Sequence, residues 1–321
     1  MNQNRNKADA VVGATAHPGP VALVDALNNT FGRHSGKRAS HAKGFCAVGT
    51  FIPDLHAAQF ADSELFKAKS AEALVRFSVG GGNPAISDKS RTVRGMALRI
   101  ASRGESWDLL MVSEPVFFAA TPESFVSFLE ARIPDPITKK PNPDKIAAHN
   151  DRFPDGKLQP SLLASHPAPR SYAQTPYFAN HAFLFKGALN QVQAARIILE
   201  PVLGATNLTE EEEASFPENF LEKELVAQLE KGTVKFEMLA QLPSPTDSLV
   251  DPSQQWVGLQ NVKLGTLHIN YVSTEDECDR LMFSPTNLPA AIAPSADPVL
   301  AARAAAYDVS FARRKAKGPQ G

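Results

Sequence analysis

The chain has 321 residues, of which 43% are hydrophobic and 21% charged, so it can bury a substantial core and lacks the composition of a disordered protein. Its 33 lysines and arginines nearly balance 34 aspartates and glutamates, which gives no electrostatic reason to expect nucleic acid as a partner. The 25 prolines argue against a compact helical bundle.

The first half of the chain combines helices with short strands. Apolar residues recur at helical spacing over residues 20–31, and Gly32 can terminate this helix. Between residues 44 and 113, short apolar runs are separated by Gly, Ser, Asn and Pro, a pattern typical of successive antiparallel strands. A second helix is predicted from Thr121, which can act as its N-cap, with Pro122 in the first helical position.

The second half begins with a polar excursion and then returns to strands. Residues 134–176 are rich in Pro, Asp, Lys and Asn, so we expect them to wrap the surface with His149 in contact with solvent. Strand-like runs resume at 177–187, 192–202, 232–242 and 264–273. His181 has no carboxylate at metal-ligand spacing, and we expect it to be structural or exposed. With a strong helix over 298–316, these elements predict an α+β fold, an antiparallel β-barrel of about eight strands with surrounding helices.

Cysteine spacing and hydropathy argue against several classes of protein. Cys46 and Cys278 form no Cys-x-x-Cys pair, so we expect neither a disulfide scaffold nor a structural zinc site, and Cys46 should be a small buried residue. No run approaches the roughly 20 apolar residues that are needed to cross a bilayer. The polar start lacks an export signal, so we expect a cytoplasmic protein, or a periplasmic one if such a signal has been removed.

The closing helix carries the residues that point most directly to chemistry. Arg303, Tyr307 and Arg314 are spaced i, i+4 and i+11, so they share one helix face. A cationic neighbour stabilises the ionised form of a phenol, and tyrosinate is a known axial ligand of haem iron. The alternative is an amphipathic helix whose arginines are solvated.

Two segments near the start of the chain contain a second set of candidates. His41 follows Arg38 by three residues, and Arg76 and Ser78 lie two apart on a predicted strand, so these two point to one face. An arginine and a hydroxyl that face a cavity could bind an anion and orient a histidine. A structural histidine and an edge-strand pattern are the alternatives.

In chain order, these segments resemble the haem catalase superfamily. The motifs are Arg-x-x-His-Ala-Lys-Gly (38–44), Val-Arg-Phe-Ser (75–78), Arg-Gly-Met-Ala (94–97), Trp-Asp-Leu (107–109), Pro-x-Phe-Phe (115–118) and Arg-x-x-x-Tyr (303–307) with a later arginine. The chain most resembles the short, single-barrel branch of catalase-related peroxidases, or minicatalases. This resemblance implies a single domain over 1–321, with the barrel over roughly 40–275 and a haem-ligand helix over roughly 298–316.

The resemblance implies a role for each candidate around a haem b cofactor. His41 would move a proton between the oxygens of a bound peroxide, and Ser78 would fix the tautomer of its ring. Tyr307 would be the axial iron ligand, kept as a phenolate by Arg303. Propionate-binding arginines and aromatic residues near the distal side and the peroxide channel would complete the site, namely Arg38, Arg76, Arg314, Phe117 and Phe125. Taken alone, the aromatic residues would equally suit a hydrophobic core.

Three small residues depart from the family pattern. Ser113 stands where full-length catalases carry a distal asparagine, and a serine would hold the second peroxide needed for disproportionation less well. Ala39 and Ser40 replace two bulky β-branched residues and would admit larger molecules. We therefore expect a peroxidase that reduces hydrogen peroxide or an organic hydroperoxide with a small organic electron donor, and that has weak or no catalase activity.

Three alternatives keep the same haem-binding residues. A true catalase would disproportionate hydrogen peroxide, and a rearranging enzyme would convert fatty-acid hydroperoxides without a reductant. A haem-binding or sensor protein would show no turnover. In each case we expect neither a membrane span nor a nucleic-acid partner, and the chain could form a homo-oligomer.

Overall fold

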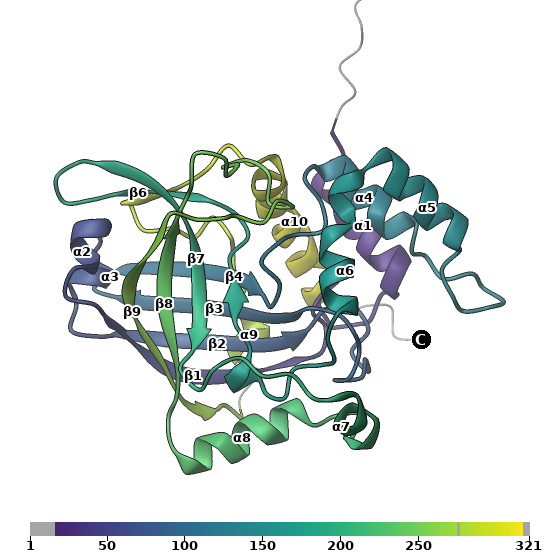
Figure 1. The fold of residues 1–321 in the computed structure, drawn as a ribbon, viewed down its shortest axis with the longest axis horizontal. Coiled ribbons are helices and arrows are strands. Elements are labelled where there is room, and N and C mark those ends of the chain that lie inside the picture. The colour runs from purple at the N-terminus through teal and green to yellow at the C-terminus, as the bar shows by residue number, and fades with distance from the viewer. Residues whose placement is uncertain (1–16, 275–276, 317–321) are drawn as a thin grey trace, which may run out of the picture.

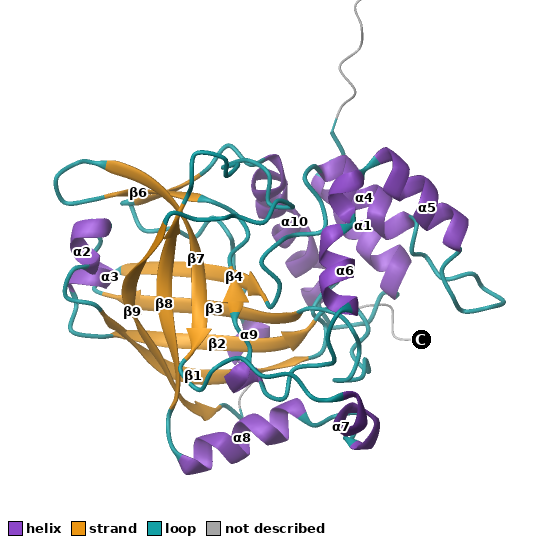
Figure 2. Cartoon of the chain, viewed as in Figure 1, coloured by secondary structure: helices purple, strands orange, loops and turns teal. Residues whose placement is uncertain are grey.

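A closed antiparallel β-barrel forms the centre of the fold, and the predicted α+β barrel with surrounding helices is confirmed (Figure 2). The computed structural model describes residues 17–274 and 277–316. The strands of the barrel, in the order of their pairing around the ring, are β1 (Gly44–Pro53), β2 (Ala71–Val79), β3 (Arg94–Ser102), β4 (Glu105–Val112), β5 (Tyr177–Phe178), β7 (Val192–Pro201), β8 (Val234–Leu242) and β9 (Gln260–Val272), which pairs again with β1. Two further strands, β6 (Phe183–Lys186) and β10 (Ile292–Pro294), extend the sheet from β7 outside the ring.

Apolar side chains fill the interior of the barrel. Phe77, Leu98, Trp107, Phe236 and Leu267 are fully buried, and each comes from a different strand. Closure gives each strand of the ring a neighbour on both sides, so the ring presents no free edge. The barrel wall is therefore a firm support for side chains that point out of it toward the helices.

Three helices pack against one another beside the barrel (Figure 1). They are α1 (Pro20–Phe31), α4 (Pro122–Glu130) and α10 (Pro298–Lys315). The other helices are α2 (Ala57–Phe60), α3 (Glu64–Lys67), α5 (Pro143–Arg152), α6 (Leu158–Ala164), α7 (Glu210–Ser215), α8 (Leu221–Lys231) and α9 (Glu277–Arg280), with short 3-10 helices at Pro154–Gly156 and Tyr172–Gln174. Within the described ranges, no helix is both long enough and apolar enough to cross a membrane.

Residue types at the helix ends explain where the three packed helices begin or stop. Helix α1 ends at Gly32, whose φ of +86° suits a residue without a Cβ. Thr121 caps α4, because its side chain accepts a hydrogen bond from the Ser124 N–H at 3.1 Å. Asp297 caps α10 by accepting hydrogen bonds from two backbone N–H groups of the first turn. The predicted helix starts at Pro122 and Pro298 are thus confirmed.

The excursion over 134–176 contains more regular structure than its composition suggests. Asn142 caps α5 and Pro143 takes its first position, so polar residues and proline begin a helix here. His149 on this helix is only 4% exposed, and its Nδ1 lies 2.9 Å from the Oγ of Ser127 in α4. The prediction that His149 is solvated was therefore wrong. The packing of α5 against α4 buries this side chain, and the local sequence does not indicate that packing.

A disulfide joins Cys46 in β1 to Cys278 in α9. Cys46 is buried as expected, but the inference from cysteine spacing missed this bond. The two residues are 232 positions apart and meet only because α9 packs on β1 and β2. The bond therefore ties a helix that follows the last barrel strand to the first barrel strand.

Candidate active site

A cavity of about 520 Å³ lies between the barrel wall and helices α1, α4 and α10. Its lining comes from segments spread between Leu23 and Arg314 and is largely apolar. All the site residues predicted from the sequence except Ser113 line this cavity, namely Arg38, His41, Arg76, Ser78, Phe117, Phe125, Arg303, Tyr307 and Arg314. The fold therefore gathers candidates that are separated by most of the sequence.

His41 and Ser78 form a hydrogen-bonded pair on one part of the lining. The His41 Nδ1 lies 3.0 Å from the Ser78 Oγ, and this hydroxyl can donate to the carbonyl oxygen of Gly95 at 3.4 Å. The serine oxygen then accepts from Nδ1–H, which leaves Nε2 as a free proton acceptor. Burial, followed by the charges of Arg76 and Arg303, lowers the pKa of His41 to about 3. The ring is therefore neutral at physiological pH and can act as a base.

The backbone around this pair is shaped to make room for it. His41 has a φ of +55°, a left-handed conformation that is uncommon for residues other than glycine. Gly95 in β3 pairs with Ser78 in β2, and a Cβ at Gly95 would lie 2.5 Å from the Ser78 Oγ and 2.6 Å from the His41 Nδ1. Only glycine leaves space for the imidazole at this point of the barrel wall.

Three arginines from different elements concentrate positive charge on the cavity. Arg76 in β2 is 4% exposed, and burial followed by the charge of Arg38 lowers its pKa to about 9. Burial, followed by Arg38, likewise lowers the pKa of Arg314 to about 10. Arg38 donates to the carboxylate of Asp279 in α9, which also lies 4.0 Å from the Arg76 Nε. Among the described carboxylates, Asp279 is the one that pairs with this cluster, so the cluster suits a ligand with further acidic groups.

Tyr307 begins a chain of buried hydrogen bonds. Its hydroxyl oxygen accepts from the Arg303 Nη2 at 2.9 Å, and the Arg303 Nη1 donates to the His181 Nε2 at 2.6 Å. The His181 Nδ1 lies 2.6 Å from the Asp297 Oδ2 and donates to it. Burial lowers the pKa of His181, in keeping with a neutral ring that accepts from the arginine. Asp297 thus anchors this chain and caps α10 at the same time.

His181 and Asp297 belong to the hydrogen-bond chain of Tyr307, and sequence reasoning missed both. The sequence analysis expected His181 to be structural or exposed, and it is buried. No carboxylate partner was assigned to it. Its partner Asp297 lies 116 residues further along the chain. The one available signal was Asp297 before Pro298, an N-cap pattern that says nothing about a histidine in another element.

The aromatic residues form a continuous wall of the cavity. Phe117 lies 6.3 Å from Phe125 between ring centroids, and Phe118 lies 5.2 Å from Phe125. The resemblance placed Phe117 near the His41 side, whereas its ring lies 6.0 Å from the ring of His181 and 5.7 Å from the Arg303 Cζ. Phe117 therefore also supports the Tyr307 chain.

Ser113 was expected in the cavity but lies outside it, whereas Asn180, which was not predicted, lines it. Ser113 is absent from the cavity lining, and its hydroxyl accepts from the Arg94 N–H at 3.0 Å. Asn180, which precedes His181, lines the cavity and is 4% exposed. Neither amide atom of Asn180 has a hydrogen-bond partner in the described part of the chain. The cavity therefore contains an asparagine that no sequence motif identified.

The chain is similar to catalases over nearly its whole length. The model of the catalase family matches residues 8–318. The catalase-related peroxidase of Synechococcus elongatus is 36% identical over 92% of this chain and 88% of its own, and that of Mycolicibacterium paratuberculosis is 35% identical over 92% and 94%. The structure of a fungal catalase gives a TM-score of 0.80 at 22% identity, and covers 88% of this chain and 60% of its own.

Proposed function

Because the chain belongs to the catalase family, we propose that it is a haem-dependent peroxidase that reduces hydrogen peroxide or an organic hydroperoxide with a small organic electron donor. The family implies a haem cofactor, which we take to be haem b. The observation that carries the proposal is that the His41–Ser78 pair and the Tyr307–Arg303 chain line one cavity.

The residues of the cavity suit a haem group. Tyr307 would hold the haem iron through its hydroxyl oxygen, which already accepts a hydrogen bond from Arg303. Two propionates would find Arg38, Arg76 and Arg314 within one positive cluster. The apolar walls suit a flat macrocycle. When bound, the haem iron supplies the redox chemistry of peroxide reduction.

The protein supplies proton transfer and charge control. His41 takes a proton from one peroxide oxygen on Nε2 and returns it to the departing oxygen, while Ser78 holds the Nδ1–H tautomer. Its pKa of about 3 keeps Nε2 unprotonated before peroxide arrives. On the other side, Arg303 donates a hydrogen bond to the hydroxyl oxygen of Tyr307, and His181 holds the guanidinium in place.

Similarity to catalase-related peroxidases favours peroxidase activity over catalase activity. Disproportionation requires a second peroxide to be held as reductant, and Ser113 lies outside the cavity lining, where its hydroxyl oxygen accepts from the Arg94 N–H. Ala39 and Ser40 belong to the cavity lining and leave space for an organic donor. We infer that any catalase activity is weak.

Stopped-flow spectra of the haem-loaded protein mixed with hydrogen peroxide test this function. An oxidised haem species that decays only when a phenolic donor is added supports a peroxidase, whereas oxygen release without a donor indicates a catalase. Conversion of a fatty-acid hydroperoxide without consumption of the donor indicates a rearranging enzyme. If Tyr307→Phe leaves the absorption spectrum of the ferric haem unchanged, the assigned ligand is wrong.

Domain extent, location and assembly complete the proposal. We infer one functional domain, because the cavity is built from the barrel and from α10 together. The buried disulfide favours an oxidising compartment such as the periplasm over the cytoplasm expected from the sequence. Formation of a homo-oligomer stays a prediction.

A further inference from the structure

The charges around the cavity are all of one sign. In the described part of the chain, its charged lining consists of arginines without a single carboxylate, namely Arg38, Arg76, Arg91, Arg132, Arg303 and Arg314. The proposed function accounts for four of them, because three face the propionates and Arg303 holds Tyr307. Arg91 and Arg132 remain, and both lie on the part of the lining near α4 and α6.

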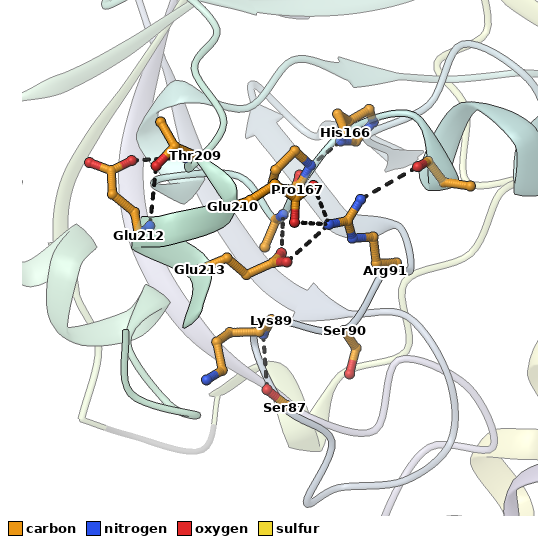
Figure 3. A network of polar contacts seen from close by, with 12 residues as sticks. Ser87, Lys89, Ser90, Arg91, His166, Pro167, Thr209, Glu210, Glu212 and Glu213 are labelled. Atoms are coloured by element: carbon orange, nitrogen blue, oxygen red, sulfur yellow. Dashed lines mark hydrogen bonds and ion pairs between the residues drawn. The ribbon is translucent and has the colours of Figure 1, made fainter. Parts of the chain in front are cut away.

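Arg91 already has its own counter-charges. Its guanidinium lies 2.9 Å from a carboxylate oxygen of Glu210 and 3.1 Å from one of Glu213, both in the first turn of α7 (Figure 3). Glu213 also accepts a hydrogen bond from the Ala168 N–H at 2.7 Å. These contacts make Arg91 part of a structural network that holds α7 near the cavity.

Arg132 has no such partner. It follows the end of α4, where its Nη1 donates to the carbonyl oxygen of Phe128 at 3.0 Å and its Cζ lies 3.4 Å from the centroid of the Phe128 ring. No carboxylate of residues 17–274 or 277–316 lies within 4.0 Å of its guanidinium. Burial alone lowers its pKa to about 10, so it stays charged at neutral pH. The single bond to a carbonyl helps to cap α4 but leaves the charge unbalanced.

An aromatic wall leads from Arg132 to the reaction centre. Phe128 lies 4.5 Å from Phe118 between ring centroids, and Phe118 lies 4.5 Å from Phe117. The Phe117 ring lies 5.7 Å from the Arg303 Cζ, which in turn reaches Tyr307. A cation at one end of an apolar wall would orient a molecule that has one acidic group and a hydrophobic body.

We propose that Arg132 binds the carboxylate of a hydrophobic organic acid, and that the organic substrate of the protein belongs to this class. The inference rests on the proposed peroxidase function, because it names the substrate of the same cavity. The acid could enter as the electron donor or as the hydroperoxide, since both share the carboxylate and the apolar body. Bound along the phenylalanines, its far end would reach Phe117, at the end of the wall next to Arg303.

Calorimetric titration of the haem-loaded protein with octanoate and with octanol tests the binding step. A charge-assisted hydrogen bond predicts that octanoate binds about ten- to a hundredfold more tightly than octanol. Arg132→Gln should abolish this preference and Arg132→Lys should keep part of it. The matched control is Arg152→Gln, because Arg152 also stacks on a phenylalanine but lies outside the cavity lining and should leave the preference unchanged. Equal affinities in the wild type, or a preference that persists in Arg132→Gln, would overturn the inference.

Kinetics with matched substrates identify the source of the acid. A phenolic carboxylic acid is compared with its methyl ester as the donor, and a hydroperoxy acid with its methyl ester as the oxidant, each in wild type and in Arg132→Gln. A rise in KM confined to the acidic donor assigns the site to the reductant, and one confined to the hydroperoxy acid assigns it to the peroxide. If neither KM changes, the inference is wrong. If a neutral phenol and hydrogen peroxide give no turnover in the wild type, the peroxidase function fails instead, and the octanoate titration still tests Arg132.

Discussion

Replacing Gly95 by alanine tests how the barrel wall positions the catalytic pair. The new Cβ would lie 2.5 Å from the Ser78 Oγ and 2.6 Å from the His41 Nδ1, whereas ordinary contacts of a Cβ begin at 3.4 Å. Either side chain would therefore have to retreat by about 0.8 to 0.9 Å. Because the Cβ would also lie 2.8 Å from the His41 Cε1, the imidazole must move even if the Ser78 hydroxyl rotates away, and this displaces the Nε2 that would accept the proton.

The expected effect is large on the rate and moderate on stability. A displacement of about 1 Å costs roughly a hundredfold in rate, and overpacking costs about 1–3 kcal/mol of unfolding free energy. Stopped-flow measurement of the reaction of the haem-loaded variant with hydrogen peroxide should therefore show a rate constant about a hundredfold below wild type, with the haem spectrum of the resting protein retained. Ser78→Ala in the same chain removes the closest contact, so the double variant should regain stability without regaining the rate.

Gly19→Ala is the matched control for this substitution. No atom lies within 4 Å of a Cβ built at Gly19, and its φ of −72° suits any residue. The control should react with peroxide as the wild type does. A Gly95→Ala rate constant within threefold of that control would refute the argument that glycine is needed to seat His41.

Four further predictions concern the protonation of His41, the disulfide and the Tyr307 chain. Because the folded-state pKa of His41 is lowered to about 3, the rate constant with peroxide should show no inflection near the ordinary histidine value of about 6.5, and a stopped-flow profile with such an inflection would contradict the assignment. Between about pH 6.5 and pH 3, His41 is protonated in the unfolded chain but not in the folded chain. The unfolding free energy, measured by urea unfolding at each pH, should therefore fall as the pH decreases over this range. Replacing Cys46 and Cys278 by alanine opens a loop of 232 residues and should lower the unfolding free energy by about 2–5 kcal/mol, and a reductant should then have no additional effect. Asp297→Asn keeps the cap of α10 but weakens the bond to His181, so we expect a loss of about 1–3 kcal/mol and a changed absorption of the ferric haem, and an unchanged spectrum would argue against the chain.

Features set within one turn of the chain were predictable from the sequence. Thr121 and Pro122 start a helix, and Gly32 ends one, because side chains there act on backbone groups two or three residues away. The strands followed from short apolar runs between turn residues. His41 and Tyr307 were singled out by their motifs, but their roles came from the resemblance to the catalase superfamily, because either residue alone also fits a structural role.

Partners that meet through the closure of the barrel were not predictable. His181 and Asp297 contact across 116 residues, and nothing near either residue marks the other. Cys46 and Cys278 are a still more distant pair, brought together only by the packing of α9. Ser113 is an error of the opposite kind. Its place in a motif suggested a cavity residue, whereas its hydroxyl oxygen accepts a hydrogen bond from the N–H of Arg94, the first residue of β3.

Arg303 acts on both candidate groups of the cavity, on His41 through its charge and on Tyr307 through a hydrogen bond. Its charge is among the causes that keep His41 unprotonated, and its Nη2 donates to the oxygen of Tyr307. At His41 this charge favours the form with fewer protons, which is a neutral imidazole. Because His181 is neutral, it does not compensate the charge of Arg303. The carboxylate of Asp297 lies on the other side of the His181 ring from the guanidinium. The positive charge of Arg303 therefore adds to the charges of the other arginines that line the cavity, and such a cavity suits a ligand that carries two carboxylates.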